Sequence, residues 1–493
     1  MVPSSRTRPV NAAPARPDRP VVLYWMVAAR RTRANYGLER ALDHARRLGK
    51  PLVVLEALRV GHEWASHRFH SFVLDGMRDN RTAFANKRGI TYYPYLEPDL
   101  GAGRGLLEAL ASQAAIVVTD DFPSFFLPAM VEAAGRRIDV QLEAVDSNGL
   151  LPIHAFNRAF STAQAFRRAW QAIIAHHLSE RPSMEPLDDP PAQPAWTIPN
   201  DVATRWPDVF TWLERGHTLG ELPIDRGVAP ASLSGGSAAA RARLAAFLDE
   251  LSAYGVARND PDRDVTSRLS PYLHWGHIGV HEVFDRLMSH EGWLGHLPSR
   301  ATGGREGWWG VSAAAESFLD EFVTWRELGY NMSTARPDDY ASYDSLPDWA
   351  RQSLERHADD PRDPVYEADI FERAETYDAL WNAAQRQLVR EGRIHNYLRM
   401  LWGKKILQWS ASPRQALAIM IHLNNKYALD GRNPNSYSGI FWVLGRYDRP
   451  WGPERPIFGV VRYMTSENTA RKVRVKEYLA RYGPLNETAG RLF

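Results

Sequence analysis

The stretch EGRIHNYLRMLWGKKILQW, residues 391–409, says most about how this chain folds. It has no proline, so we expect one helix over the whole stretch. Asn396, Arg399 and Trp402 are spaced three residues apart and share one face of that helix, and Trp409 lies about two turns further along. Asn and Arg followed by indoles suit a redox cofactor with an aromatic path for electrons. A tryptophan-rich core helix with a satisfied arginine would show the same pattern.

The composition excludes several kinds of site. None of the 493 residues is cysteine, which excludes disulfides, thiolate metal sites, iron–sulfur clusters and thiol nucleophiles. The length allows two or three domains, and a hydrophobic content of 44% is enough to form their cores. No window approaches the roughly 18 uninterrupted apolar residues of a membrane span, and no targeting signal is convincing. We therefore expect a soluble, intracellular protein.

Charge is unevenly distributed along the chain. The formal net charge is +2, yet residues 391–493 contain 17 Lys and Arg against 7 Asp and Glu. A basic end on a nearly neutral protein predicts a surface that binds a polyanion. Only seven of the 60 basic residues are lysine, and arginine suits phosphate recognition and ring stacking. A GC-rich genome would produce the same bias toward arginine.

Apolar runs alternate with helical patterns over the first 150 residues. The predicted strands are 21–27, 51–58, 91–96, 115–121 and 138–145, and the helices between them include 36–49 and 67–89. This alternation predicts a doubly wound parallel sheet. Ligands of such sheets bind beyond the carboxyl ends of the strands, which places a small-molecule pocket near Thr119–Asp121. The glycines of 101–105 fail the dinucleotide fingerprint and predict a turn that opens a helix.

Changes in composition mark the expected domains. Residues 1–20 are rich in Pro, Arg and Ala and predict a disordered tail. Residues 181–236 contain too many prolines and glycines for long regular elements, and predict an inter-domain linker. Helical patterns dominate from 237 to 482. We expect an α/β domain over 21–180, an all-helical domain over 237–482 and a short tail over 483–493.

Three other segments carry candidate chemistry, and the first is a helix start. Ser270 before Pro271 predicts a capping hydroxyl followed by proline at the first helical position, and Thr266 and Ser267 add hydroxyls beside it. Such a helix end binds anions, for example a cofactor pyrophosphate. A well-capped helix without a ligand would have the same sequence.

The second segment pairs a carboxyl with an indole. Glu321 and Trp325 are four residues apart, so both side chains project from one face of a predicted helix. Desolvation beside the indole would favour the neutral carboxyl, which donates a hydrogen bond. An exposed glutamate beside a core tryptophan is the alternative.

The third segment is a tight turn after Asn424. Asp-Gly at 430–431 and Asn-Pro at 433–434 mark the turn, and a buried Asp430 would pair with Arg399. The residues that follow interleave an aromatic ring with arginines, a pattern expected where phosphates are bound and a base is stacked: Trp442, Arg446, Arg449 and Arg462.

Together these segments resemble one family. The matching motifs are TSRLSPYLHWG (266–276), EFVTWRELGYN (321–331), YDALWNAAQ (377–385), HNYLRMLWGKKILQW (395–409), YALDGRNPNSYSGIFW (427–442) and RPIFGVVRYM (455–464). They are similar to motifs of the photolyase/cryptochrome superfamily, and in particular to those of class II cyclobutane pyrimidine dimer (CPD) photolyases. The resemblance covers about residues 20–482. Asn433 and Ser436 depart from it, since the family pattern has Asp and Gly there.

The resemblance implies a fold and a reaction. The fold is an α/β domain with a doubly wound parallel sheet, followed by an all-helical domain that binds FAD. The reaction is that of a carbon–carbon lyase, a deoxyribodipyrimidine photo-lyase: excited, reduced FAD gives an electron to a flipped-out dimer, the ring splits and the electron returns. The alternative is a cryptochrome-like blue-light photoreceptor that signals through a protein partner.

The resemblance also implies a role for each candidate residue. FAD would be bound by Tyr254, Thr266, Ser267, Leu269, Ser270, Asn396, Arg399, Asn424 and Asp430. Asn424 is the candidate partner of the flavin N5 atom. The lesion would be bound by Glu321, Trp325, Met400 and Trp442. Electrons would reach the flavin through Trp402, Trp381 and Trp409, with Trp409 near the surface. DNA would be contacted by Arg258, Asn259, Arg449 and Arg462.

The implied partner is double-stranded DNA that contains pyrimidine dimers. We expect a monomer with no metal and no membrane association. A prokaryotic protein of this kind would be cytoplasmic and associated with the nucleoid, and a eukaryotic one would be nuclear. The sequence leaves open whether the α/β domain binds an antenna chromophore, and whether that chromophore would be a deazaflavin or a folate.

Overall fold

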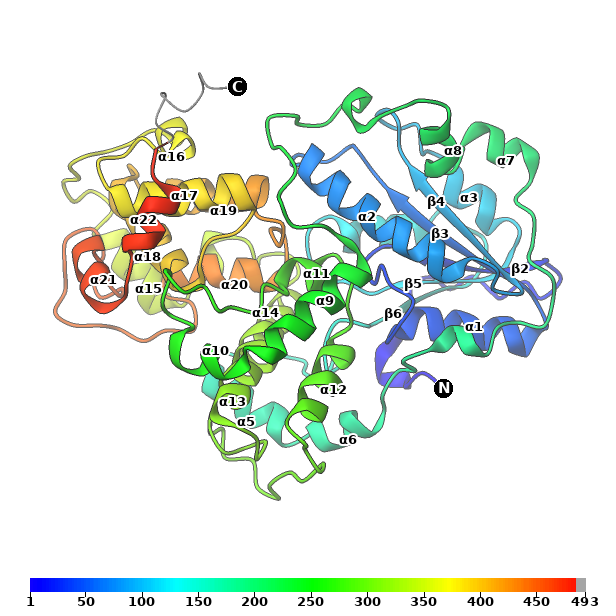
Figure 1. The fold of residues 1–493 in the computed structure, drawn as a ribbon, viewed down its shortest axis with the longest axis horizontal. Helices are drawn as coiled ribbons and strands as arrows, with labels where there is room; N and C mark the ends of the chain where they lie inside the picture. The colour runs from blue at the N-terminus through cyan, green and yellow to red at the C-terminus, as the bar shows by residue number, and fades with distance from the viewer. Residues whose placement is uncertain (485–493) are drawn as a thin grey trace. The chain divides into compact units, whose positions relative to one another are not determined.

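The computed structural model describes residues 1–484 and contains two compact units (Figure 1). The first comprises residues 1–160, 164–249 and 267–337, and the second comprises 161–163, 250–266 and the chain from 338 onward. The predicted domain limits near 180 and 236 stay a prediction. Most of the predicted tail, residues 485–493, lies outside the described residues.

A six-stranded sheet organises the first unit, in the order β1-β6-β5-β2-β3-β4. The strands are β1 (Thr7–Pro9), β2 (Val21–Met26), β3 (Leu52–Leu58), β4 (Ile90–Leu96), β5 (Ala114–Asp120) and β6 (Leu142–Val145). Strands β2 to β6 pair in parallel, with Val22 opposite Leu52 and Leu23 opposite Val117. The predicted doubly wound parallel sheet is confirmed.

The first residues of the chain are ordered, so the prediction of a disordered tail over 1–20 is wrong. β1 pairs antiparallel with β6, and the short helix η1 (Ser4–Arg6) precedes it. Arg6 is buried, with a guanidinium nitrogen 3.2 Å from the Asp146 carboxylate. The composition of residues 1–20 gave no sign of this order, because β6 and Asp146, which bind the segment, lie about 140 residues away in sequence.

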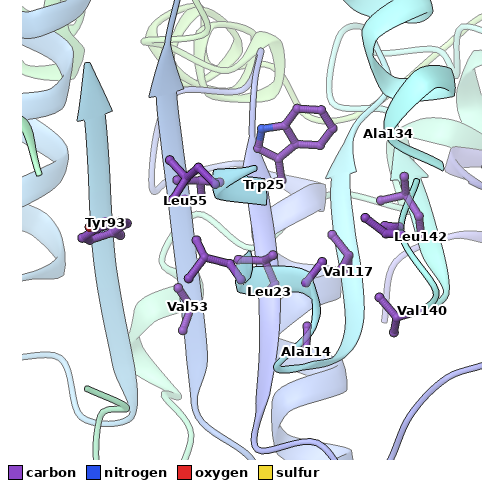
Figure 2. Packing of buried hydrophobic residues seen from close by; sticks show 14 of the residues in the cluster. Leu23, Trp25, Val53, Leu55, Tyr93, Ala114, Val117, Ala134, Val140 and Leu142 are labelled. Carbon is purple, nitrogen blue, oxygen red and sulfur yellow. The ribbon is translucent and has the colours of Figure 1, made fainter. Parts of the chain in front are cut away.

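Both faces of the sheet are buried, as expected for parallel strands covered by helices. Successive side chains point to opposite faces. Leu23, Val53 and Val117 lie in the cluster on one face, which Figure 2 shows, together with residues of α3 and α4. Tyr24 and Val54 lie in the cluster on the other face, which α1 covers. This double burial explains why the strands read as continuous apolar runs.

The helices of the first unit that pack on or follow the sheet are short to medium in length. They are α1 (Tyr36–Leu48), α2 (His67–Phe84), α3 (Leu106–Ala111), α4 (Leu127–Gly135), α5 (Ala163–Gln171), α6 (Ile174–Ser179), η2 (Pro186–Asp188), α7 (Asn200–Arg205), α8 (Val209–Glu214), η3 (Leu219–Glu221), α9 (Gly236–Asp249), α11 (Ser270–His274), α12 (Val280–His290), α13 (Ala313–Leu319), η4 (Asp320–Trp325) and α14 (Arg326–Ala335). The segment 181–236 contains only brief helices, as its prolines and glycines predict. The predicted turn before α3 is also confirmed.

The second unit is helical. Its elements are α10 (Leu251–Ala257), η5 (Tyr343–Ser345), α15 (Asp348–Arg356), α16 (Ala368–Arg373), α17 (Ala379–Glu391), α18 (Asn396–Trp409), α19 (Pro413–Tyr427), α20 (Pro434–Val443), α21 (Ser466–Lys472) and α22 (Lys476–Tyr482). The prediction of one helix over 391–409 is wrong. α17 ends at Glu391, Gly392 adopts a left-handed conformation (φ 71°) that closes it, and α18 begins at Asn396. Across the described residues, no helix has both the length and the apolar character needed to cross a membrane.

The carboxyl ends of β2 and β5 meet at the point where the strand order reverses, the usual place for a ligand in such sheets. Here Asp120 occupies it. One carboxylate oxygen accepts the backbone N–H groups of residues 27, 28 and 29 at 2.7–2.9 Å. The other accepts the Tyr24 hydroxyl at 2.6 Å. The cavity beside Asp120, bordered by Arg31 and Arg326, has a volume of about 10 Å³, which is room for one water molecule.

Replacing Asp120 should therefore destabilise the first unit. In Asp120→Asn an amide N–H₂ would stand where oxygen now accepts buried donors, and we expect a loss of about 3 kcal/mol or more in the free energy of unfolding. Urea unfolding monitored by circular dichroism measures it. Thr119→Val is the matched control, because Thr119 is equally buried but donates a single hydrogen bond, to the Trp25 carbonyl at 2.8 Å. Equal losses in the two variants would contradict this account.

Candidate functional site

The predicted site residues are divided between the two units. The first unit contains Ser267, Leu269, Ser270, Glu321 and Trp325. The second contains Tyr254, Arg258, Asn259, Thr266, Trp381, Asn396, Arg399, Met400, Trp402, Trp409, Asn424, Asp430, Trp442, Arg449 and Arg462.

Glu321 and Trp325 lie on a single π-helical turn, η4, which joins α13 to α14. Turns of this kind are rare and are frequent at functional sites. Both side chains are half-buried, whereas the three residues between them are buried. The turn is anchored from its other side by Asp320, which lies 2.7 Å from the Arg167 guanidinium. The expected pairing of carboxyl and indole on one face is compatible with this turn, and the alternative of an exposed glutamate beside a core tryptophan is wrong.

The helix start at Ser270 differs from its prediction. Ser270 is the first residue of α11 rather than its cap. Leu269 occupies the N-cap position, and no side-chain hydrogen bond caps the helix there. The reason is conformational: a cap needs extended backbone, and Leu269 is already helical (φ −84°, ψ −14°). The Ser267 hydroxyl instead accepts the Leu269 N–H at 3.4 Å. Ser270 is exposed.

Within the second unit, Thr266 belongs to a polar network. Its hydroxyl donates to Asp264 at 3.1 Å, and the same carboxylate oxygen accepts from Arg393 at 3.1 Å. Burial works against the Arg393 charge, but the contact with Asp264 outweighs it and raises the pKa of the guanidinium above its ordinary value. Sequence reasoning missed Asp264 and Arg393, although Arg393 lies in the quoted stretch.

Next to this network lies His395, which the sequence analysis also missed. Its side chain is buried, and burial lowers its pKa to about 4. Within residues 1–484 neither ring nitrogen has a hydrogen-bond partner. Buried polar atoms without partners mark places where a ligand or ordered water completes the hydrogen bonding. His395 begins the helix that carries Asn396 and Arg399, so it supports a cofactor position in this unit.

The predicted pair of Arg399 and Asp430 is present, with 3.9 Å between the guanidinium nitrogen and the carboxylate oxygen. Asp430 is 7% exposed and lies in the loop between α19 and α20. That loop is tightly held by Asn425, whose side chain accepts the Arg432 N–H at 2.9 Å and whose carbonyl accepts the Arg432 guanidinium at 2.6 Å. Gly431 allows the close approach, because a Cβ there would lie 2.8 Å from the Asn424 carbonyl.

Asn424, the candidate partner of flavin N5, has a fixed amide. Its Nδ2 donates to the Asn425 side chain at 3.2 Å and to the Ser436 hydroxyl at 2.9 Å. With both N–H groups engaged, this amide would accept a further hydrogen bond at Oδ1. Ser436 is one of the two departures from the family pattern. It therefore has a local role, orienting Asn424.

The three predicted electron-transfer tryptophans are linked in the expected order. The Trp381 indole N–H donates to the Trp402 carbonyl at 2.9 Å, and the ring centroids of Trp381 and Trp409 are 6.1 Å apart. The Trp402 indole N–H is satisfied by Gln385 at 2.9 Å. Trp381 and Trp409 are fully buried and Trp402 is 2% exposed. These three buried side chains, which we call the aromatic group, lie on α17 and α18.

Trp409, predicted to lie near the surface, does not itself reach solvent, because its exposed fraction is 0%. Lys405 holds its ammonium 5.0 Å from the centroid of the Trp409 ring. On another side, Tyr377 packs with its ring centroid 5.2 Å away, and Tyr377 is 63% exposed. The solvent-exposed end of this aromatic group is therefore a tyrosine from the segment before α17.

Two of the predicted DNA-binding arginines, Arg449 and Arg462, lie against the indole ring of Trp451. Arg449 and Arg462 place their guanidinium carbons 4.9 and 4.2 Å from the centroid of the Trp451 indole. Asp448 holds the group together: it accepts the Trp451 indole N–H at 3.0 Å and lies 3.3 Å from Arg462. Trp451 is 36% exposed. Sequence reasoning missed Trp451, although it stands two residues after Arg449.

The remaining predicted residues differ in burial. Met400 and Trp442 are half-buried, on α18 and α20 respectively. Tyr254 is buried on α10 and accepts a hydrogen bond of 3.5 Å from Arg258. Asn259 and Asn396 are exposed.

Solved structures of known proteins include one with this fold. A bacterial class III photolyase from Agrobacterium tumefaciens aligns with 94% of this chain and 86% of its own, with a TM-score of 0.62 and 16% sequence identity. At that identity the likeness shows the fold alone. The fold is therefore that of the photolyases. No family model matches the chain.

Relatives in sequence define the family more closely. A deoxyribodipyrimidine photo-lyase from Methanothermobacter thermautotrophicus is 32% identical over 487 residues, which is 98% of each chain. Those of Oryza sativa subsp. japonica and Arabidopsis thaliana are 31% and 30% identical and span 97% and 93% of this chain, and 90% and 88% of their own. The chain belongs to the family of deoxyribodipyrimidine photo-lyases.

The loop that presents Asp430 should not tolerate a larger residue at Gly431. In Gly431→Ala the new methyl group would meet a backbone carbonyl that cannot move aside, and we expect a loss of about 1–3 kcal/mol in the free energy of unfolding. Gly439→Ala is the control, because a Cβ there first meets another atom at 4.0 Å and alanine favours the helix α20. Thermal melts of both variants check the prediction, which fails if the two behave alike.

Proposed function

We propose that this chain is a class II CPD photolyase, which repairs pyrimidine dimers in DNA under blue light with FAD as its cofactor. Membership of the photo-lyase family supports the repair reaction, and the sequence motifs favour class II. The observation in this chain that supports repair over light sensing is the pair Glu321 and Trp325 on η4. A half-buried carboxyl beside an indole is what a flipped base needs, and a photoreceptor has no use for it. No comparable feature favours the cryptochrome alternative.

FAD, when bound, supplies light absorption and one-electron transfer. The residues proposed to bind it in the second unit are Tyr254, Thr266, His395, Asn396, Arg399, Asn424 and Asp430. Two of the polar groups support this assignment: the unpartnered ring of His395 and the oriented amide of Asn424. The Arg399 guanidinium would favour negative charge on a nearby ring, and Asn424 Oδ1 would accept a proton donor. Ser267, Leu269 and Ser270 are proposed contacts from the first unit.

The lesion would be bound by aromatic and carboxyl groups. Trp325 and Trp442 offer stacking surfaces for a flipped dimer, and Met400 an apolar contact. Glu321 would donate a hydrogen bond to a thymine carbonyl, where negative charge develops. A damaged base pair is weakly stacked, so flipping it costs less than the few kcal/mol needed for a normal pair.

DNA outside the lesion would be bound through charge and stacking. Arg449 and Arg462 are held on Trp451 by Asp448, which places two guanidinium groups and one indole on the surface of the second unit. Such a group binds phosphates and stacks on an exposed base without reading sequence. Arg258 and Asn259 are proposed as further contacts, and the substrate is double-stranded DNA with the enzyme acting as a monomer.

The aromatic group of α17 and α18 would return electrons to the cofactor. We extend the predicted order of Trp402, Trp381 and Trp409 by Tyr377, the exposed ring beside Trp409. The Lys405 ammonium above Trp409 disfavours a positive charge on that indole. Tyr377 can give up its phenolic proton to water when it is oxidised, so it would hold the oxidising equivalent until a small thiol reduces it.

An antenna chromophore does not fit the crevice of the first unit. The crevice at the reversal of strand order holds about one water molecule and is lined by Arg31, Asp120 and Arg326. A deazaflavin or a folate is many times larger.

Repair should depend on Glu321. With photoreduced protein and a thymine-dimer oligonucleotide, blue light should restore absorbance at 260 nm. Glu321→Ala should lower the rate roughly 10- to 100-fold, because the hydrogen bond to the developing charge is lost. Glu477→Ala, which removes an exposed carboxylate, should leave the rate unchanged. Absence of light-dependent recovery in a wild-type protein that contains reduced FAD would contradict the proposed function.

Photoreduction should depend on the aromatic group and not on Glu321. Under illumination with a thiol, Trp381→Phe should slow reduction of the bound flavin by about tenfold or more, and Tyr377→Phe should shorten the lifetime of the light-induced radical seen by transient absorption. Trp451→Phe is the control for loss of a tryptophan outside the group. Repair by chemically reduced Trp381→Phe protein should equal that of the wild type. Normal photoreduction in this variant would overturn the assigned route.

A further inference from the structure

We propose that His176, His177 and Glu180 form a binding site for one divalent transition-metal ion, with Zn²⁺ as the ion that fits best. The residues lie at the end of α6 in the first unit, and no step of the repair reaction uses them. Within the part of the chain that the structure describes, they form the only group of three such side chains with ligand atoms all within 4.8 Å of one another.

The distances between the ligand atoms match a tetrahedral ion. His176 Nε2 lies 3.5 Å and His177 Nδ1 lies 3.7 Å from the same oxygen of Glu180. Zn²⁺ binds nitrogen and oxygen at about 2.0–2.1 Å, so neighbouring ligands of a tetrahedral ion are about 3.3–3.4 Å apart. An octahedral ion with the same bonds would need about 3.0 Å. The two distances to Glu180 are thus within a few tenths of an ångström of the tetrahedral value, and the two histidine nitrogens lie within 4.8 Å of each other.

Burial of the ligand atoms provides the second, independent observation. His177 is 8% exposed, yet its Nδ1 and the facing Oε2 of Glu180 have no hydrogen-bond partner among the described residues. Two buried polar atoms that face each other without a hydrogen bond are costly unless a third group lies between them.

The surrounding charges do not prevent cation binding. Arg6 is the cation that acts on His177, and it is paired with Asp146 at 3.2 Å, so its charge is largely offset. The backbone of Glu180 is itself fixed, because its carbonyl accepts a hydrogen bond from the Tyr36 hydroxyl. A bound cation would add positive charge beside the Glu180 carboxylate, which already faces the two histidines.

The ligand set selects the kind of ion. Two imidazoles and one carboxylate suit Zn²⁺ and its transition-metal neighbours, whereas Mg²⁺ and Ca²⁺ prefer oxygen ligands alone. His176 has a side chain that is 71% exposed, so water can supply the fourth ligand. Because residues 176, 177 and 180 all lie within one turn, the ion would fasten the end of α6 at the start of the segment 181–236.

Zinc binding to the untagged full-length protein tests the proposal. We would titrate Zn²⁺ against a chromophoric chelator and expect one equivalent bound by the wild type. His176→Ala removes an exposed ligand and Glu180→Gln keeps the shape of the side chain, so both variants should fold. Each should weaken the affinity at least about tenfold, the loss that removal of even an outer-shell partner can cause.

A matched control is present in the chain. His217 and Glu221 form an exposed pair with the same four-residue spacing, 2.8 Å apart, and no third ligand joins them among the described residues. His217→Ala should leave Zn²⁺ affinity unchanged, and added Zn²⁺ should raise the melting temperature of the wild type but not of His176→Ala. Equal affinities in the wild type, His176→Ala and Glu180→Gln would overturn the site, as would the absence of saturable binding.

Discussion

The side chain of Asn425 is the constraint on which the helical unit depends. It is fully buried, accepts the Arg432 N–H, accepts from Asn424 and donates to the Tyr437 hydroxyl at 3.2 Å. These bonds force a tight loop between α19 and α20, with Arg432 in the left-handed region at φ 67°. The loop presents Asp430 to Arg399, and the same contacts orient Asn424. A single buried amide thus places two of the groups proposed to bind the cofactor, Asp430 and Asn424.

Burial separates the two tasks of the aromatic residues. Trp381, Trp402 and Trp409 are enclosed among helices, which suits electron transfer and keeps water from an oxidised indole. Trp451 is partly exposed and holds two guanidinium groups on its ring, which suits contact with a polyanion. The roles that we propose for these tryptophans therefore differ because their surroundings differ, since the residue type is the same.

In the first unit, a carboxylate occupies the position where ligands of parallel sheets usually bind. Its parallel sheet has the reversal of strand order at which ligands of such folds bind. Here Asp120 uses its carboxylate to satisfy three successive backbone N–H groups, and Arg31 and Arg326 border the small cavity beside it. These hydrogen bonds contribute to stability. The chemistry that we propose for this unit lies on the π-helical turn that carries Glu321 and at the end of α6.

Local patterns in the sequence predicted the strands β2 to β6 and the helices between them, because periodicity and spacing are properties of neighbouring residues. The turn at 430–434 also led to the pair of Arg399 and Asp430, which the structure contains. The order of Trp402, Trp381 and Trp409 as an electron path came from the family resemblance and stays a prediction. Other features depend on partners far along the chain: the pairing of β1, the end of α17 at Glu391, the burial of Trp409 and the contact of Tyr377 with it. The ligand-like arrangement of His177 and Glu180 also arises only when burial removes their water. The sequence by itself determined which elements form and which residue types they carry. Tertiary packing decided which polar atoms lose contact with water. A buried polar atom without a partner costs free energy, so a ligand that supplies the missing partner binds there.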